Sequence, residues 1–182
     1  MGDDRRQADT ARLLSELANG REEAFNELYD RFGTRLFRVA QAQLRNRHDA
    51  EDAVQEVFIA LIRSRHKLSE VRDLAAYLFA ALRHTVARRS VRRAGEPIST
   101  EIDVAEQDKT PRDADPRAER LESALAALPP EQRELLALKF EGELTFAEIG
   151  GTLGISANTA ASRYRYALEK LRGWLKNEVT QR

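Results

Sequence analysis

In this sequence, the polar and basic side chains near residue 160 are the best candidates for binding another molecule. They are hydroxyl, amide and guanidinium donors, and no Asp or Glu occurs between Ser156 and Ala167 to repel an anion. Such donors can bind phosphate oxygens and can hydrogen-bond to base edges in DNA. We therefore expect a DNA-binding face made of Ser156, Asn158, Thr159, Ser162, Arg163, Arg165 and Tyr166.

Two helices joined by a glycine turn are expected to position these donors. The first runs from about Thr145 to Leu153, and Glu148 follows Thr145 at the spacing of a capping box. Gly154 can adopt a positive φ in the turn, and Ser156 is suited to cap the second helix. This pattern predicts a helix-turn-helix, whose second helix can enter the major groove. A helical hairpin that only packs against a core has the same spacing.

A second group of donors lies in the C-terminal half of a helix predicted from Leu74 to about Arg93, with Asp73 as its cap. No acidic residue interrupts this group. Arginines near a helix C-terminus can complement the helix dipole, but so many exceed that need, and we expect them to bind phosphate. Tyr77 and Phe79 lie upstream, where an aromatic ring can stack on an unpaired base. The group is Tyr77, Arg83, His84, Arg88, Arg89, Arg92 and Arg93.

An acidic helix is predicted from Asp49, which is expected to cap it, to about Ser64. Its expected core face is Ala50, Ala53, Val54, Val57, Leu61 and Ile62. Acidic and amide side chains occupy other positions, and Phe58 falls near the boundary between the two faces. Such a surface can contact a basic partner, although an ordinary solvated helix face has the same composition. The outward set is Asp49, Asp52, Gln55, Glu56 and Phe58.

Composition limits the remaining possibilities. The 182 residues carry a formal net charge of +0, so the chain as a whole is not basic. Any surface that binds nucleic acid therefore has to be formed by a local cluster of basic residues. The absence of cysteine excludes disulfides and thiolate metal sites. No apolar run reaches the roughly 18 residues of a membrane span, and the N-terminus lacks the apolar segment of a signal peptide. We expect a cytoplasmic protein.

The helical periodicity predicts an all-α fold of two small helical domains. Helices are expected over residues 8–18 and 22–32, and the second can continue as one bent helix to Leu44. Phe25, Leu28, Tyr29 and Phe32 form an apolar stripe on the second helix. Residues 94–119 contain three prolines and more acids than bases, which predicts a flexible acidic linker. The predicted domains are therefore 1–93 and 120–182.

Two stretches resemble the extracytoplasmic-function (ECF) class of bacterial RNA polymerase sigma factors. The sequence DAEDAVQEVFIAL, from Asp49 to Leu61, is similar to the segment with which the family binds polymerase. The sequence LPPEQRELLALKFEGELTFAEIGGTLGIS, from Leu128 to Ser156, resembles its C-terminal promoter-reading domain. The Gly150-Gly151 pair departs from a helix that is usually rich in alanine. The resemblance implies a promoter-specificity subunit that binds the polymerase core and directs transcription initiation.

The resemblance also implies partners and roles. The outward residues of the acidic helix would contact the polymerase clamp helices, and the C-terminal domain would contact the flap. The basic helix would face the promoter −10 element, and the donors from Ser156 to Tyr166 would face the −35 element. An anti-sigma factor is a further candidate partner. No cofactor, bound metal or enzymatic activity is expected.

Two other interpretations account for part of the sequence. A helix-turn-helix regulator that binds an operator as a homodimer leaves both the basic helix and the acidic segment unexplained. The pair His48-Asp49 is also found in metal-dependent phosphohydrolases, but such a site needs further ligands that converge on the metal. Only His66 and His84 remain to supply imidazole, and both lie in the basic region.

Overall fold

The computed structural model describes residues 2–95 and 115–180, and every regular element in these ranges is a helix. The elements are α1 (Gly2–Ala18), α2 (Glu22–Leu44), α3 (Arg47–Arg63), the 3-10 helix η1 (Arg65–Glu70), α4 (Leu74–Gly95), α5 (Pro116–Ala127), α6 (Pro130–Phe140), α7 (Phe146–Leu153) and α8 (Ala157–Thr180). The predicted all-α fold is confirmed. None of the helices in the described ranges is both long and apolar enough to cross a membrane.

The predicted helix-turn-helix forms with the expected caps. The Thr145 backbone N–H donates to the Glu148 carboxylate over 2.6 Å, and the Glu148 N–H donates to the Thr145 hydroxyl over 3.2 Å. Gly154 follows α7 with φ of 68°, a conformation that costs glycine little. The Thr159 N–H then donates to Ser156 Oγ over 3.0 Å at the start of α8. Local hydrogen bonding therefore fixes both ends of the turn.

Several boundaries differ from those predicted. Asp49 does not cap α3, because Asn46 precedes the helix and its side chain accepts the Asp49 N–H over 2.9 Å. Asp49 lies instead in the first turn, where a carboxylate still complements the helix dipole. Asp73 does cap α4, accepting the Ala76 N–H over 2.9 Å. Residues 65–70, between the two predicted helices, form the 3-10 helix η1, in which Leu68 is fully buried.

Helices α1 to α4 enclose most of the apolar core. Leu13, Leu17, Leu28 and Leu36 are fully buried there, and α2 is a single helix through Gly33 as the sequence allowed. The predicted core faces of α2 and α3 need correction at two residues. Tyr29 is 59% exposed and Ile62 is 44% exposed, although both were placed on core faces. Each lies at the edge of its apolar stripe and lines a surface groove between α2 and α3.

Helices α5 to α8 form the second packed unit. Ala124, Leu128, Leu136, Ala167 and Leu171 are buried in a cluster between α5, α6 and α8. Helix α5 begins at Pro116, with the Asp115 carboxylate accepting the Arg117 N–H over 2.9 Å. The last residues of the predicted linker are therefore helical, and Ala94 and Gly95 end α4. The rest of the predicted linker, residues 96–114, lies outside the described residues.

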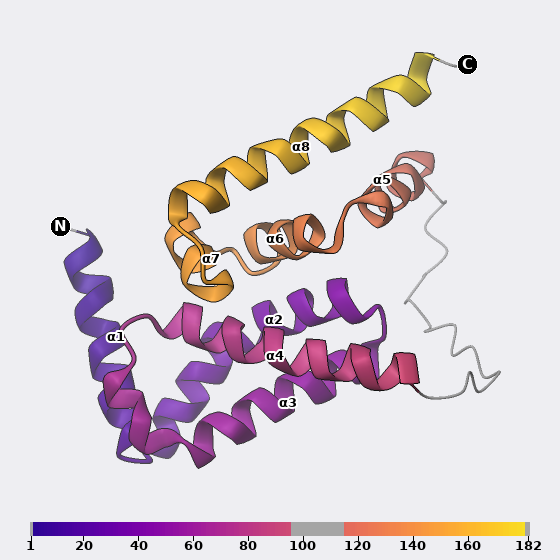
Figure 1. Ribbon diagram of the computed structural model, residues 1–182. Helices are drawn as coiled ribbons and strands as arrows, with labels where there is room; N and C mark the ends of the chain where they lie inside the picture. Colours follow the sequence, from indigo (N-terminus) through magenta and orange to yellow (C-terminus); the bar gives the residue numbers. More distant parts are fainter. Residues whose placement is uncertain (1, 96–114, 181–182) are drawn as a thin grey trace.

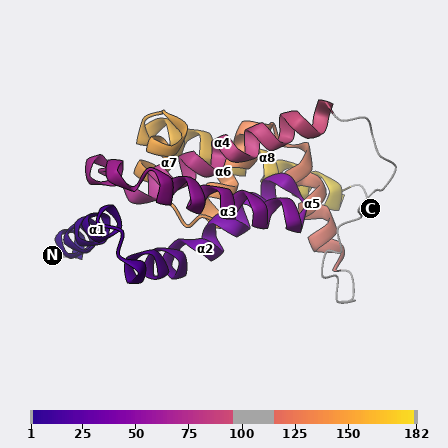
Figure 2. The same cartoon turned by 90° about the horizontal axis from the view of Figure 1, so that it is seen from below.

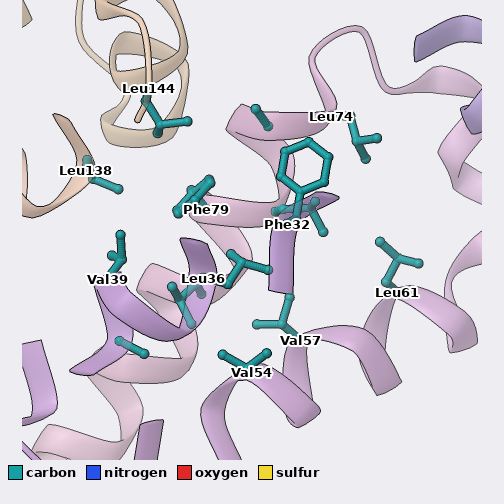
Figure 3. Close-up of a cluster of buried hydrophobic side chains, with 14 of the residues drawn as sticks. Phe32, Leu36, Val39, Val54, Val57, Leu61, Leu74, Phe79, Leu138 and Leu144 are labelled. Carbon is teal, nitrogen blue, oxygen red and sulfur yellow. The ribbon is translucent and has the colours of Figure 1, made fainter. Parts of the chain in front are cut away.

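The two helical units pack directly against each other. Helices α6 and α7 lie along α2 and α4, and both views show this arrangement (Figures 1 and 2). Leu138 and Leu144 from the second unit belong to the same buried cluster as Val39 and Phe79 from the first (Figure 3). The apolar core is therefore continuous across the boundary between the predicted domains.

Candidate functional site

A surface groove runs between α2 and α3 and has a volume of about 660 Å³. Gln55 and Phe58 from the predicted polymerase-binding set line it. The Phe58 ring packs against the Tyr29 ring with their centroids 5.2 Å apart. Ile59 and Ile62 are exposed along the same wall. We call this surface the α2–α3 groove; its lining is Tyr29, Gly33, Thr34, Phe37, Arg47, Glu51, Val54, Gln55, Phe58, Ile59 and Ile62.

The acidic residues of the same predicted set lie on another side of α3, next to α4. Arg89 Nη1 is 3.5 Å from an Asp52 oxygen and 3.9 Å from an Asp49 oxygen. Arg89 Nη2 is 3.5 Å from a Glu56 oxygen, and Arg88 also pairs with Glu56. We call these five residues the α3–α4 ion cluster. The structure thus pairs predicted polymerase-binding acids with predicted phosphate-binding arginines.

The ion cluster is unevenly exposed. The Arg88 side chain is 68% exposed and the Asp52 side chain 60%, whereas Arg89 is only 21% exposed. The Arg89 Nε atom is buried and has no hydrogen-bond partner. A buried guanidinium nitrogen without a partner is costly, and this cost offsets part of what the three ion pairs of Arg89 contribute. Arg88 is the more accessible of the two for an external anion.

The other residues of α4 that were predicted to bind DNA lie in different environments. Arg83 Nε lies 2.9 Å from the Glu134 carboxylate of α6, while His84 is exposed. Tyr77 is half-buried, with its hydroxyl 3.5 Å from Ser64 Oγ. Phe79 is 1% exposed, so the expectation that it could stack on a base is wrong. Arg92 and Arg93 lie near the end of α4, but their side chains fall outside the described part of the chain.

The predicted donors of the helix-turn-helix mostly face outward from α8. Asn158, Ser162, Arg165 and Tyr166 are exposed. Arg163 is also exposed, at 48% of its side chain, and lies 3.8 Å from the Glu131 carboxylate of α6. These residues all lie within the first three turns of α8.

Three of the predicted donors also have a structural role. Ser156 Oγ accepts the Thr159 N–H and lies 2.8 Å from Thr159 Oγ1. The Ser162 hydroxyl donates to the Thr159 carbonyl over 3.0 Å. The capping hydroxyls are therefore already engaged with the helix, which leaves amide and guanidinium groups as the freest donors on this face.

The structure adds residues that the sequence did not assign to any binding surface. Tyr29, Ile59 and Ile62 complete the α2–α3 groove, and Arg35 and Glu134 join the two helical units. Ile59 could have been found from the sequence, because it is an apolar residue that does not belong to the predicted core face of its helix. Nothing local distinguished Arg35 or Glu134 from any other charged residue on a helix.

The alternative of a metal-dependent enzyme finds no support in the described ranges. They contain no group of three or more His, Cys, Asp or Glu side chains placed to hold a metal ion. His48 is 87% exposed, and its Nδ1 lies 3.8 Å from Glu51. His66 and His84 do not converge with it into a ligand set.

Comparison with known sequences gives consistent matches. Residues 28–96 match the Sigma-70 region 2 family, and residues 124–173 match Sigma-70 region 4. The chain is 32% identical over 175 residues to the RNA polymerase sigma factor CarQ of Myxococcus xanthus, covering 92% of this chain and 100% of that protein. It is 32% identical over 166 residues to the ECF RNA polymerase sigma factor SigE of Mycolicibacterium smegmatis, covering 84% of this chain and 62% of that protein.

Solved structures with a similar fold include two complexes. CnrH bound to the cytosolic domain of CnrY matches with a TM-score of 0.67 and 24% identity, over 92% of this chain and 97% of CnrH. The sigma factor RpoE bound to the anti-sigma factor NepR, from Bartonella quintana, matches with a TM-score of 0.63 and 22% identity, over 84% of this chain and 96% of RpoE. At these identities the likeness concerns the arrangement of the helices.

Proposed function

The chain belongs to the ECF class of RNA polymerase sigma factors, and on that basis we propose how its surfaces recognise polymerase and promoter. In this proposal residues 1–93 bind the polymerase core and the −10 element. Residues 120–182 bind the −35 element and the flap, and residues 94–119 connect them. The chain thereby directs polymerase to promoters, and the bacterial cytoplasm is its proposed site of action.

The α2–α3 groove is the proposed docking site for the polymerase clamp helices, and it is the observation that carries the proposal. Ile59 and Ile62 expose apolar surface beside the Tyr29–Phe58 pair, and a partner helix with apolar side chains would remove that surface from water. Asp49, Asp52 and Glu56 lie nearby on α3, where they favour a partner with basic flanks.

The proposed DNA contacts divide into two kinds. On the −10 side, Arg88, Arg89, Arg92 and Arg93 would hold phosphates, with Tyr77, Arg83 and His84 closer to the bases. On the −35 side, the N-terminal turns of α8 would enter the major groove, as the second helix of a helix-turn-helix does. Asn158, Arg163 and Arg165 supply the donors, and Ser156, Thr159, Ser162 and Tyr166 border them.

An anti-sigma factor is a further proposed partner. RpoE, whose fold this chain shares, was solved with the anti-sigma factor NepR. A partner of this kind would compete with polymerase for the exposed apolar wall of the α2–α3 groove. Copurification of the chain with such a protein, lost when Ile59 is replaced by aspartate, would support this part of the proposal.

The polymerase-binding surface can be tested with two neighbouring substitutions on α3. Ile59 and Ala60 are both exposed, but only Ile59 lines the groove. We expect Ile59→Asp to weaken capture of core polymerase and to lower run-off transcription from a promoter library, because it places a charge in an apolar contact. Ala60→Asp is the matched control and should leave both unchanged. Equal capture by the two variants, with helicity intact by circular dichroism, would contradict the groove assignment.

A further inference from the structure

Three long stretches of the chain contain no Asp or Glu. Two of them, residues 74–95 and 149–168, carry the surfaces proposed to bind DNA. The third, residues 31–48, covers the second half of α2, the turn after it and the start of α3. This stretch is locally positive although the whole chain is neutral, so it favours contact with an anionic group. Its basic residues are Arg31, Arg35, Arg38, Arg45, Arg47 and His48.

Contacts inside the chain engage three of the five arginines in this stretch. The pairs are Arg31 with Asp9, Arg35 with the Gly142 carbonyl, and Arg47 with Glu51. Arg38 and Arg45 are exposed, and neither guanidinium has an ion-pair or hydrogen-bond partner among the residues that the structure describes. An exposed arginine is common on any protein surface, so the position of these two decides what they can bind.

Arg38 and Arg45 border the α2–α3 groove. Arg38 directly follows Phe37 and comes one turn after Thr34, and both of those residues line the groove. Arg45 comes seven residues after Arg38, close to two turns of helix, so the Cα atoms of the two arginines lie on the same side of α2. Arg45 also lies two residues before Arg47, which lines the groove where the chain turns from α2 into α3 (Figure 1). We call Arg38 and Arg45 the basic flank of the groove.

The backbone of Arg45 supports a role for its side chain. Arg45 ends α2 in the left-handed conformation, with φ of 53°, and its N–H donates to the Gln41 carbonyl over 2.9 Å. Glycine takes this conformation at lower cost than a residue with a Cβ. An arginine held in a strained conformation on the surface therefore indicates that its side chain is needed there.

The opposite side of the groove is acidic. Beyond the groove lining on α3 lie Asp52 and Glu56, next to α4, and the Asp52 side chain is 60% exposed. The α3–α4 ion cluster to which they belong contains three carboxylates and two guanidiniums, so it is net negative. The apolar lining of the groove is thus bordered by positive charge on α2 and by negative charge on α3.

We infer that the α2–α3 groove accepts the polymerase helix in one direction only, with an acidic flank of that helix against Arg38 and Arg45. Its apolar side chains would cover Ile59 and Ile62, and its basic flank would face the acids of α3. Turning a helix end for end, with the same face on the groove, exchanges its two flanks and would bring like charges together. The inference rests on the proposed function and adds to it the chemistry and the direction of the bound helix.

Charge reversal tests the basic flank. We expect Arg38→Glu with Arg45→Glu to lower the affinity for core polymerase, measured without DNA, by about tenfold, because two exposed attractions become repulsions. Arg21→Glu with Arg72→Glu makes the same change in net charge at two exposed positions outside the groove lining. This control should bind core polymerase like the wild type, and circular dichroism should show equal helicity in both double variants.

Cross-linking tests the direction of the bound helix. Arg38→Lys and Arg45→Lys keep the positive charge and supply a primary amine, which a carbodiimide joins to a carboxylate in direct contact. We expect each amine to be linked to an Asp or Glu of the polymerase, identified by mass spectrometry. The two linked acids should lie about two turns apart on one helix, and their order gives its direction. Arg72→Lys, exposed and away from the groove, should give no such link.

The effect of Ile59→Asp separates failure of this inference from failure of the proposed function. If Ile59→Asp weakens capture of core polymerase but the Arg38 and Arg45 reversal matches its control, the groove remains the docking site and the inference is overturned. A reversal that lowers affinity for duplex DNA and leaves capture unchanged would also overturn it, because the two arginines would then hold phosphates. Failure of the wild-type chain to capture core polymerase would overturn the proposed function, and the inference with it.

Discussion

Arg89 on α4 lies with its Nη1 atom 3.5 Å from the Oδ2 atom of Asp52 on α3. This contact joins the helix proposed to bind DNA to the helix proposed to bind polymerase. Glu56 extends it by pairing with both Arg88 and Arg89. In the free chain these carboxylates occupy guanidinium groups that would otherwise attract phosphate, so the two surfaces are electrostatically coupled.

Removal of the acidic partners should strengthen DNA binding by the free chain. We expect Asp52→Asn with Glu56→Gln to raise affinity for any duplex by up to about fivefold, since the two carboxylates are 60% and 40% exposed and pairs made by such groups are of modest strength. The dependence of log affinity on log salt should steepen, because more arginines reach phosphates. Fluorescence anisotropy at several salt concentrations measures both. Glu51→Gln, which removes a carboxylate paired with Arg47 on the same helix, is the control and should change neither.

Arg163 is expected to read sequence in the −35 element. It lies on the exposed face of α8, early enough to reach base edges, and a bidentate contact from Arg to guanine contributes about 1–3 kcal/mol of discrimination. Arg163→Ala should relax the preference at one or two upstream positions and leave the downstream preference unchanged. Selection from randomised promoters by the holoenzyme measures this. Identical sequence preferences at uniformly lower occupancy would mean that Arg163 holds the backbone.

Replacement by alanine should change the stability of the chain in opposite directions at two glycines of the C-terminal unit. Gly150→Ala places a Cβ 2.7 Å from the Ile155 carbonyl oxygen, which forces the turn of the helix-turn-helix apart. We expect a loss of stability of about 1–3 kcal/mol, as for overpacking in a core, and weaker −35 recognition. Gly173 in α8 has no atom near its Cβ position, so Gly173→Ala should stabilise the chain by about 0.5–1 kcal/mol. Thermal unfolding of both variants provides the comparison.

The packing of α1 against α2 should weaken at acid pH. The hydrogen bond from Arg12 lowers the pKa of Asp9 below its ordinary value of 3.8, and Arg31 adds a smaller effect. Because the folded pKa is the lower one, the stabilisation is present above the unfolded value and is lost as pH falls through the folded value. Arg12→Gln should raise the Asp9 pKa more than Arg31→Gln does. Carboxyl NMR titration measures both shifts, and an equal response to the two substitutions would contradict the assignment.

The sequence alone determined the helices and most of their caps. Thr145 with Glu148, Gly154, Ser156 and Asp73 act on backbone groups within three or four residues, and such interactions can be inferred from spacing. The helix-turn-helix, the all-α class and the family resemblance follow from these local patterns. The N-cap of α3 was misplaced because Asn46 and Asp49 are both good capping residues three positions apart.

Only the tertiary structure decided which residues of the apolar helix faces are buried. Tyr29 and Ile62 have the same helical spacing as core residues, but no helix covers the edges where they lie, whereas Phe79 is enclosed between the two units. The pairing of Arg83 with Glu134 joins residues 51 positions apart, and Gly151 meets Ala76 across an even longer gap in the chain. No local pattern encodes such contacts, because they arise from how whole helices pack against one another.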